Sequence, residues 1–167
     1  FSYDLRVTDK DEVILYGSFR LTNVIKFSKN DSLISNDTTS AFVTGFVATF
    51  DSTGKCINYS KVYDGKNLSF TRGLSLDVWN DEPILLFQTG NDSVNLYSRQ
   101  SVIRIGPPPK NVASVIVKYS QGLDTLRWHK LLDVGSLGTL EINKIRVSQG
   151  NIYFSGNYSG AIRLGKY

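Results

Sequence analysis

The chain has 167 residues, 41% of them hydrophobic, with 19 basic and 15 acidic side chains and a net charge of +4. A chain of this length can bury a substantial core, yet no stretch approaches the roughly 18 consecutive apolar residues needed to span a bilayer. The basic residues are scattered singly rather than gathered in a stripe. We therefore expect solvated surface charge, no membrane span and no nucleic-acid interface.

The first 40 residues divide into an apolar and a polar part. Residues 1–27 supply the first strands, and residues 28–40, SKNDSLISNDTTS, are predicted to form a polar loop. Asp31, Asn36 and Asp37 in this loop carry the oxygen ligands that calcium prefers, but their spacing is not that of an EF-hand. We interpret the loop as solvated and expect no metal site.

Residues 41–63 form the clearest single pattern in the chain. Phe46 and Phe50 fall on the same face of an extended segment, and apolar and polar residues alternate around them with the period of two that indicates a strand. The polar turn Asp51–Gly54 then reverses the chain before a second alternating segment. The pattern predicts an antiparallel hairpin with one dry face and one wetter face.

The next part of the chain contains further strands joined by turns and one stiff connector. Residues 64–75 are predicted to be a linking loop, and residues 76–105 to carry three strands with turns at Asn80–Pro83 and Gly90–Asp92. The segment Gly106–Pro109 reads GPPP, which favours a polyproline spacer rather than a docking site for an aromatic groove.

The hairpin pattern then recurs, and the cycle begins again. Residues 110–134 repeat the hairpin of residues 41–63 with a constant offset of 69 positions, and residues 135–167 restart the sequence of strands. The matched pairs are Phe50 and Tyr119, Ile57 and Leu126, Tyr59 and Trp128, and Lys61 and Lys130. A fixed period indicates a repeat architecture. The repeat units cover roughly residues 1–70 and 71–139, with an incomplete third unit at 140–167.

A second segment also recurs, ahead of each hairpin. Val7–Phe19 is similar to Val147–Tyr158, and a weaker middle copy lies at Leu76–Phe87. Each copy reads as strand, polar turn, strand. Together with the hairpin, this gives four short strands per period, which is the content of one blade of a β-propeller.

These motifs resemble the SBBP-type β-propeller repeats of bacterial and archaeal surface and secreted proteins. Val13–Phe19 and Ile152–Tyr158 match the part of that repeat that ends in Gly-x-aromatic. Ala41–Val43, Phe50–Gly54 and Trp128–Lys130 match its later parts. The resemblance covers nearly the whole chain and implies an all-β antiparallel fold with propeller-type blades, but it implies no reaction.

The chain also departs from that family in sequence and in length. Tyr59 stands where the family has tryptophan, and Gln88 interrupts the glycine of the middle copy. A closed propeller has roughly four to eight blades, whereas this chain holds about two and a half periods and no methionine. We therefore expect residues 1–167 to form a single β-repeat domain that is a fragment of a larger propeller. A two-sheet β-sandwich is the alternative.

Asparagine gives the main indication of cellular location. Twelve asparagines among 30 serines and threonines would produce roughly two N-x-S/T sequons by chance, but the chain has six. The candidate glycosylation sites are Asn30, Asn36, Asn58, Asn67, Asn91 and Asn157. Cys56 is the lone cysteine, so no internal disulfide can form. The sequons favour an extracellular or cell-surface protein.

Candidate catalytic residues are few. His129 is the only histidine and is expected to face solvent, and neither Asp51 nor Asp133 is clearly placed to form a pair with it. The acidic pairs Asp11-Glu12 and Asp81-Glu82 recur at equivalent turns, where acids favour chain reversal. We predict no catalytic site, no cofactor and no metal.

The sequence therefore predicts a non-catalytic structural or adhesive module, a subunit or decoration of an extracellular assembly. Sheet edges left exposed by an unfinished repeat would bind a protein partner or a second copy. The alternative is a lectin-like propeller that binds a glycan or another ligand by ring stacking. The aromatic candidates for that role are Tyr16, Tyr59, Trp79 and Trp128.

Overall fold

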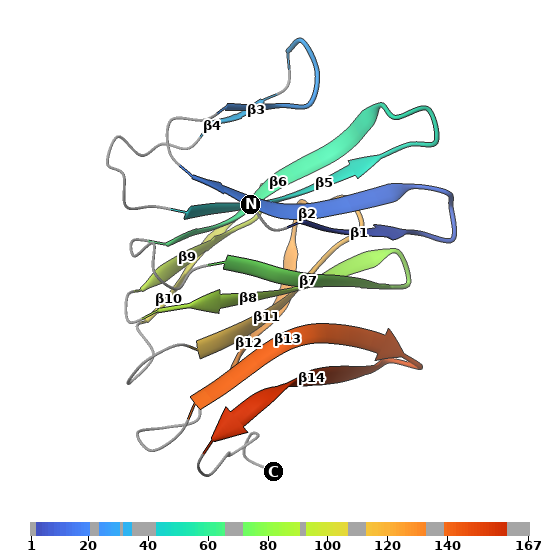
Figure 1. The fold of residues 1–167 in the computed structure, drawn as a ribbon. Helices are drawn as coiled ribbons and strands as arrows, with labels where there is room; N and C mark the ends of the chain where they lie inside the picture. Colours follow the sequence, from blue (N-terminus) through green and yellow to red (C-terminus); the bar gives the residue numbers. More distant parts are fainter. Residues whose placement is uncertain are drawn as a thin grey trace.

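A computed structural model describes residues 3–20, 24–30, 32–34, 43–65, 72–90, 93–106, 113–132 and 139–159. Within these ranges every regular element is a strand and every pairing is antiparallel, which confirms the all-β prediction (Figure 1). The strands are β1 Tyr3–Val7, β2 Val13–Arg20, β3 Val24–Lys26, β4 Ser32–Ile34, β5 Val43–Phe50, β6 Cys56–Gly65, β7 Arg72–Trp79, β8 Glu82–Thr89, β9 Val94–Tyr97, β10 Val102–Ile105, β11 Ala113–Tyr119, β12 Leu126–Leu132, β13 Thr139–Ser148 and β14 Asn151–Ser159.

The strands form four sheets. The largest has six strands in the order β1-β2-β5-β6-β9-β10, and the next has four in the order β12-β11-β8-β7. β13 pairs with β14, and β3 pairs with β4, as two separate two-stranded sheets. Figure 1 shows the β13–β14 sheet, the four-stranded sheet and the six-stranded sheet one above another.

The sequence period corresponds to a four-strand unit in this topology. β1, β2, β5 and β6 pair consecutively, as do β7, β8, β11 and β12, and β13 and β14 occupy the first two positions of a third unit. The first strands of the three units begin at residues 3, 72 and 139. Each complete unit carries an inserted hairpin between its second and third strands, β3–β4 in the first and β9–β10 in the second. β9 pairs with β6, so the second hairpin widens the sheet of the first unit.

The first two units pack face to face through a shared hydrophobic core. Tyr63 on β6 stacks on Phe87 on β8, with ring centroids 4.4 Å apart. Tyr16 on β2 is 1% exposed, and its hydroxyl donates a hydrogen bond of 3.2 Å to the Leu86 carbonyl. Such a buried phenol contributes apolar area while its polar end finds a partner, so it both packs the two sheets and joins them.

A second core lies on the opposite face of the four-stranded sheet. Ile84 and Leu86 on β8 pack there with Ile142 and Ile145 on β13. The four-stranded sheet is thus covered on both faces by other sheets, which rules out the two-sheet sandwich. The described strands do not close into a ring.

This stacking also corrects the prediction that each hairpin has a wetter face. β11 is buried along almost its whole length, and so are the described side chains of β5. Both are interior strands of their own sheets. The four-stranded sheet has sheets on both faces, and the Phe27 ring packs on the outer face of the six-stranded sheet. Residues that alternate along these strands therefore face two different apolar environments, rather than the core on one side and solvent on the other.

The polar loop predicted at residues 28–40 contains a strand. β4 covers Ser32–Ile34 and pairs with β3, with Leu33 opposite Ile25. Phe27, between these strands, stacks on Tyr59 with ring centroids 4.8 Å apart. The polar run thus contains a short two-stranded ribbon, and Phe27 beside it contacts the six-stranded sheet through Phe46, Phe50 and Tyr59.

The loop and strand boundaries after residue 64 also differ from the prediction. β7 begins at Arg72, inside the predicted linking loop, and a register shift lies between Gly73 and Ser75. Residues 72–105 therefore carry four strands, where three were predicted for residues 76–105. Edge strands with irregular register have weak periodicity, which is why the sequence pattern missed these ends.

Candidate functional site

The first strands of the three units meet at one side of the molecule. β1, β7 and β13 are edge strands of their respective sheets, and β7 contacts both β1 and β13 (Figure 1). An edge strand leaves half of its backbone N–H and C=O groups without a neighbouring strand. The chemistry of this region follows from how those groups are satisfied.

Side chains of one unit accept hydrogen bonds from the backbone of the next unit. The Asp4 carboxylate on β1 accepts a 2.9 Å bond from the Leu76 amide on β7. In the same way, the Ser75 hydroxyl oxygen on β7 accepts a 3.3 Å bond from the Ile145 amide on β13. Leu76 and Ile145 occupy the same position in their units, so the junction between the first and second units is repeated between the second and third.

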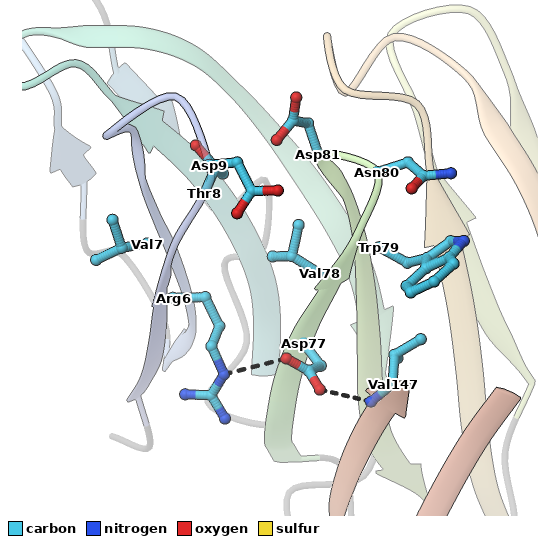
Figure 2. A pocket seen from close by; sticks show the side chains of 10 residues that line it. All are labelled: Arg6, Val7, Thr8, Asp9, Asp77, Val78, Trp79, Asn80, Asp81 and Val147. Carbon is cyan, nitrogen blue, oxygen red and sulfur yellow. Dashed lines mark hydrogen bonds and ion pairs between the residues drawn. The ribbon is translucent and has the colours of Figure 1, made fainter. Parts of the chain in front are cut away.

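Asp77 extends this arrangement to three strands. Its carboxylate accepts a 2.6 Å hydrogen bond from the Val147 amide and a 3.3 Å bond from Arg6 Nε (Figure 2). Asp4 pairs with Arg6 at 3.2 Å and with Lys144 at 2.9 Å. We refer to Asp4, Arg6, Ser75, Asp77 and Lys144 as the edge-strand cluster.

The cluster is charged but internally compensated. The side chains of Asp4 and Asp77 are only 14% and 13% exposed, so each carboxylate depends on its partners for stability. Burial raises the pKa of Asp4, but the Leu76 amide, Lys144 and Arg6 together outweigh it and bring that pKa below its ordinary value. Asp4 is therefore ionised at neutral pH and holds three strands together.

A cleft of about 290 Å³ opens beside the cluster, between the β1–β2 turn and the β7–β8 turn (Figure 2). Arg6 and Asp77 line it together with Trp79 and Asp81. Lys10 of the first turn pairs with Asp81 of the second at 2.8 Å. In the described ranges no group of three histidine, cysteine or acidic side chains could hold a metal ion. The cleft thus offers paired charges, the Asp9 carboxylate and the Trp79 ring.

The recurring acidic pairs have a structural role in these turns. Asp11 and Asp81 adopt positive φ angles of 58° and 60°, and Gln149 has a φ of 51° in the third hairpin. Asp and Asn tolerate this left-handed conformation better than most residues do. The acids at Asp11 and Asp81 therefore suit left-handed positions in turns of different length, and the third hairpin uses Gln149 and Gly150 instead.

The four predicted stacking aromatics are not brought together. Tyr16 is buried in the core and has no free face for a ligand. Tyr59 is half-buried against Phe27, and Trp79 is half-buried beside the cleft. Trp128 is 37% exposed on the edge strand β12, where it lines a shallow hollow with its neighbours in sequence.

Within the described residues, the structure does not bring a nucleophile and a base together around His129. His129 lies exposed on β12, opposite Val117. Asp51 is engaged within its own turn, where Thr53 donates hydrogen bonds from its hydroxyl at 2.6 Å and its amide at 2.9 Å. Asp133 lies outside the described residues.

The asparagines of three of the six sequons fall within the described ranges. Asn30 is exposed beside the β3–β4 ribbon, and Asn157 is exposed on β14. Asn58 is half-buried on β6. Asn36, Asn67 and Asn91 lie outside the described residues, as do Asp31 and Asp37 of the calcium candidates.

The edge-strand cluster was missed in the sequence. Its members are polar residues that alternate with apolar ones in short first strands, for example Asp4 and Arg6 around Leu5. Superposing the first strands of the units places Asp4, Ser75 and Lys144 at one position. An alignment of the three first strands would have placed these residues together, but it requires the strand register, which is known only from the structure.

Comparison with known proteins identifies no relative: no family model, no curated protein and no solved structure matches this chain. In the described part of the chain, no helix is long and apolar enough to cross a membrane.

Proposed function

We propose that the chain is a non-catalytic structural module with propeller-type blades, part of a secreted or cell-surface assembly. The observation that carries this proposal is the repeated junction: consecutive four-strand units are joined by an apolar interface and by side chains that replace a missing strand. Such a stack resembles that of repeat proteins, in which units mainly contact their neighbours, although here Lys144 of the third unit also pairs with Asp4 of the first. The motifs of SBBP-type repeats agree with this architecture.

The distribution of charge supports a structural role. The ionisable side chains with shifted pKa values are paired within turns or between strands, and none is directed at an open cavity as a lone acid or base. For example, Lys118 and Arg127 hold the pKa of Glu82 below its ordinary value across β8, β11 and β12. Perturbed groups that are fully paired favour structure over catalysis.

The extracellular placement rests on the sequons. Asn30 and Asn157 are exposed and can present an amide to a glycosyltransferase, whereas Asn58 is half-buried within a sheet. We therefore propose that Asn30 and Asn157 carry glycans in the secretory pathway.

The test is the mass and assembly state of the protein isolated from its native source. We expect an intact mass above 18.6 kDa that falls on enzymatic deglycosylation, in a particle larger than one chain that persists after glycan removal. Replacement of Asn30 and Asn157 by Gln should reduce the mass shift, and replacement of Asn58 should leave it unchanged. A bare, monomeric chain in its native setting would contradict the proposal.

A lectin-like function is the second candidate, supported by one observation. Trp128, 37% exposed, forms a hollow of about 370 Å³ with His129 and Lys130 on β12. An exposed ring beside hydrogen-bond donors suits the apolar face of a sugar. Retention on a glycan array that is lost in Trp128→Ala, but kept in the matched surface variant Tyr153→Ala, would favour it.

A further inference from the structure

In the second and third units, one set of four apolar side chains faces the preceding unit, and the first unit has an equivalent set. We call this set the rear face. It comes from the first two strands, with the same register in every unit. The rear faces are Leu5, Val7, Val13 and Leu15 in the first unit, Leu76, Val78, Pro83 and Leu85 in the second, and Ile145, Val147, Ile152 and Phe154 in the third.

The three rear faces differ in burial. Leu76 and Ile145 are each 0% exposed, because the preceding unit covers them. Leu5 and Val7, at the corresponding positions of the first unit, are 55% and 60% exposed. The first-strand side of this face is therefore covered in the second and third units and open in the first, although Val13 and Leu15 of the first unit are half-buried and Phe154 of the third is 40% exposed. Adjacent exposed apolar side chains such as Leu5 and Val7 indicate a contact site.

The surface that covers a rear face also has a defined composition, and we call it the forward face. It consists of two side chains from the first strand and two from the second. The forward faces are Asp4, Arg6, Ile14 and Tyr16 in the first unit, Ser75, Asp77, Ile84 and Leu86 in the second, and Lys144, Arg146, Tyr153 and Ser155 in the third. The first two supply two large apolar side chains and at least one oxygen acceptor.

The acceptors meet backbone amides of the rear strand. The Asp4 side chain accepts a hydrogen bond from the Leu76 amide, and the Ser75 side chain accepts one from the Ile145 amide. Leu76 and Ile145 lie at the first apolar position of their rear faces. Asp77 receives the amide of Val147, the second such position, at 2.6 Å. In β1, the Leu5 amide donates a hydrogen bond of 3.1 Å to the carboxylate of its own neighbour Asp4. The open rear face thus has both the apolar pattern and the amide register of the two that are covered.

We propose that the rear face of the first unit is a docking surface for one more sheet of this repeat type. That sheet presents apolar side chains at the positions of Ile84 and Leu86, and oxygen acceptors at the positions of Ser75 and Asp77. The inference deepens the proposed function by specifying the chemistry of its protein partner, and it rests on that function only for the partner's presence in an assembly.

A second copy of this chain does not meet those requirements. At the positions of Ser75 and Asp77, the forward face of its third unit carries Lys144, which already pairs with Asp4, and Arg146, and neither side chain can accept a hydrogen bond. Between the first two units, Arg6 pairs with Asp77. If the third unit of a second copy docked on the first unit, Arg146 would take the place of Arg6, and Arg6 would take the place of Asp77. Two guanidinium groups would then face each other. The partner is therefore a unit whose first strand carries Asp, Asn, Ser or Thr.

The experiment supplies such a unit by placing residues 71–138 directly before Phe1 of the full chain. The added unit brings a second Ser75 and a second Asp77 to the first unit. Amide hydrogen exchange measured by NMR at Leu5 and Val7 should slow by roughly tenfold or more relative to the unextended chain, because opening the new junction is then required. The amides of Ile145 and Val147 report the natural junction in the same spectrum.

Two variants of the extended chain sharpen the test. Ser75→Ala with Asp77→Ala in the added unit alone should remove the protection of Leu5 and Val7 while leaving Ile145 and Val147 protected. Leu5→Asp with Val7→Asp should also remove it, whereas Val102→Asp, at an equally exposed apolar position on β10, should not.

Three outcomes overturn the proposal. The added unit may acquire protected core amides while Leu5 exchanges as fast as before, which would show that it folds without docking. An added unit that stays unfolded also contradicts the proposal, because the first unit already folds with a neighbour on one side only. The third outcome is that the unextended chain self-associates in sedimentation velocity and that Leu5→Asp abolishes this association. The rear face of the first unit would then bind a second copy of the chain. None of these outcomes depends on whether the native protein is found in an assembly, so the failure of one proposal can be told from the failure of the other.

Discussion

Asp77 contacts strands of three sheets, since it lies on β7, accepts the Val147 amide of β13 at 2.6 Å and pairs with Arg6 of β1 at 3.3 Å. Asp77→Ala would leave the amide and the guanidinium without their shared acceptor. We expect the free energy of unfolding to fall by about 2–4 kcal/mol, because the groups left behind are largely buried. Urea denaturation measures this change.

Two variants separate the roles of that carboxylate. Asp77→Asn keeps an oxygen for the Val147 amide and loses only the ionic attraction to Arg6, so it should cost less than Asp77→Ala. Asp9→Ala, at an exposed acid of the neighbouring turn, should change stability by less than about 0.5 kcal/mol. Equal losses for Asp77→Ala and Asp9→Ala would mean that the edge-strand cluster is not a stabilising element.

Asp4 gives the stability of the molecule a defined dependence on pH. Although burial opposes its ionisation, the Leu76 amide, Lys144 and Arg6 bring its pKa in the folded state below the ordinary value of 3.8. A depressed carboxyl pKa stabilises the folded protein above the unfolded-state pKa, and this contribution is lost as the pH falls through the folded-state pKa. Asp4→Asn should therefore be less stable than the wild type at neutral pH, and the difference should shrink steadily below pH 3.8.

Urea titrations of both proteins from about pH 7 to about pH 2 test this. The comparison between wild type and variant is needed because the pKa values of Asp51, Glu82 and Asp124 are also lowered, so both proteins lose stability in acid. A difference that stays constant across the titration would show that Asp4 contributes through its shape and not its charge.

At the scale of single elements, the β13–β14 hairpin depends on one glycine. A Cβ at Gly156 would run into the Glu141 carbonyl oxygen and would lie 2.8 Å from the Glu141 carbonyl carbon and the Ile142 Cα of the paired strand. Backbone cannot yield as a flexible side chain can, so Gly156→Ala should destabilise the hairpin by about 1–3 kcal/mol. Gly106→Ala is the control, because its Cβ would meet nothing within 4 Å.

Hydrogen exchange localises that effect. Amides of β13 and β14 should exchange faster in Gly156→Ala, while those of β2 and β5 keep their wild-type rates, because these strands lie two sheets away. Acceleration spread evenly over all sheets would indicate that the hairpin and the rest of the molecule unfold together.

The elements also show which parts of the fold the sequence could predict. The β5–β6 and β11–β12 hairpins were predicted because period-two alternation and a polar turn are local features. β7 was placed too late because its bulge between Gly73 and Ser75 breaks that alternation. The edge-strand cluster was missed entirely, since Asp4 finds the Leu76 amide only after two units have docked, and no local pattern encodes a contact between residues so far apart.

At the scale of the whole molecule, the period of 69 residues predicted a repeat but not how the repeats pack. The sequence could not distinguish one wet face from a second core, because Ile84 and Leu85 are both apolar although they face opposite neighbours. Stacking is also what leaves Leu5 exposed while Leu76 is buried. Consequences of stacking, such as the order in which the sheets open, therefore had to be argued from the structure.

The stack predicts that the β13–β14 sheet opens before the four-stranded and six-stranded sheets, because it has two strands and a neighbour on one face only. Leu86→Ala, at the interface between the four-stranded sheet and β13, should cost about 2–5 kcal/mol and should accelerate exchange mainly in β13 and β14. Val47→Ala is the matched change in the opposite core and should instead accelerate β1, β2 and β5. Exchange followed by mass spectrometry distinguishes the two patterns. If both variants accelerate all strands equally, the three sheets form one cooperative unit, and the nearest-neighbour description of the repeat would be wrong.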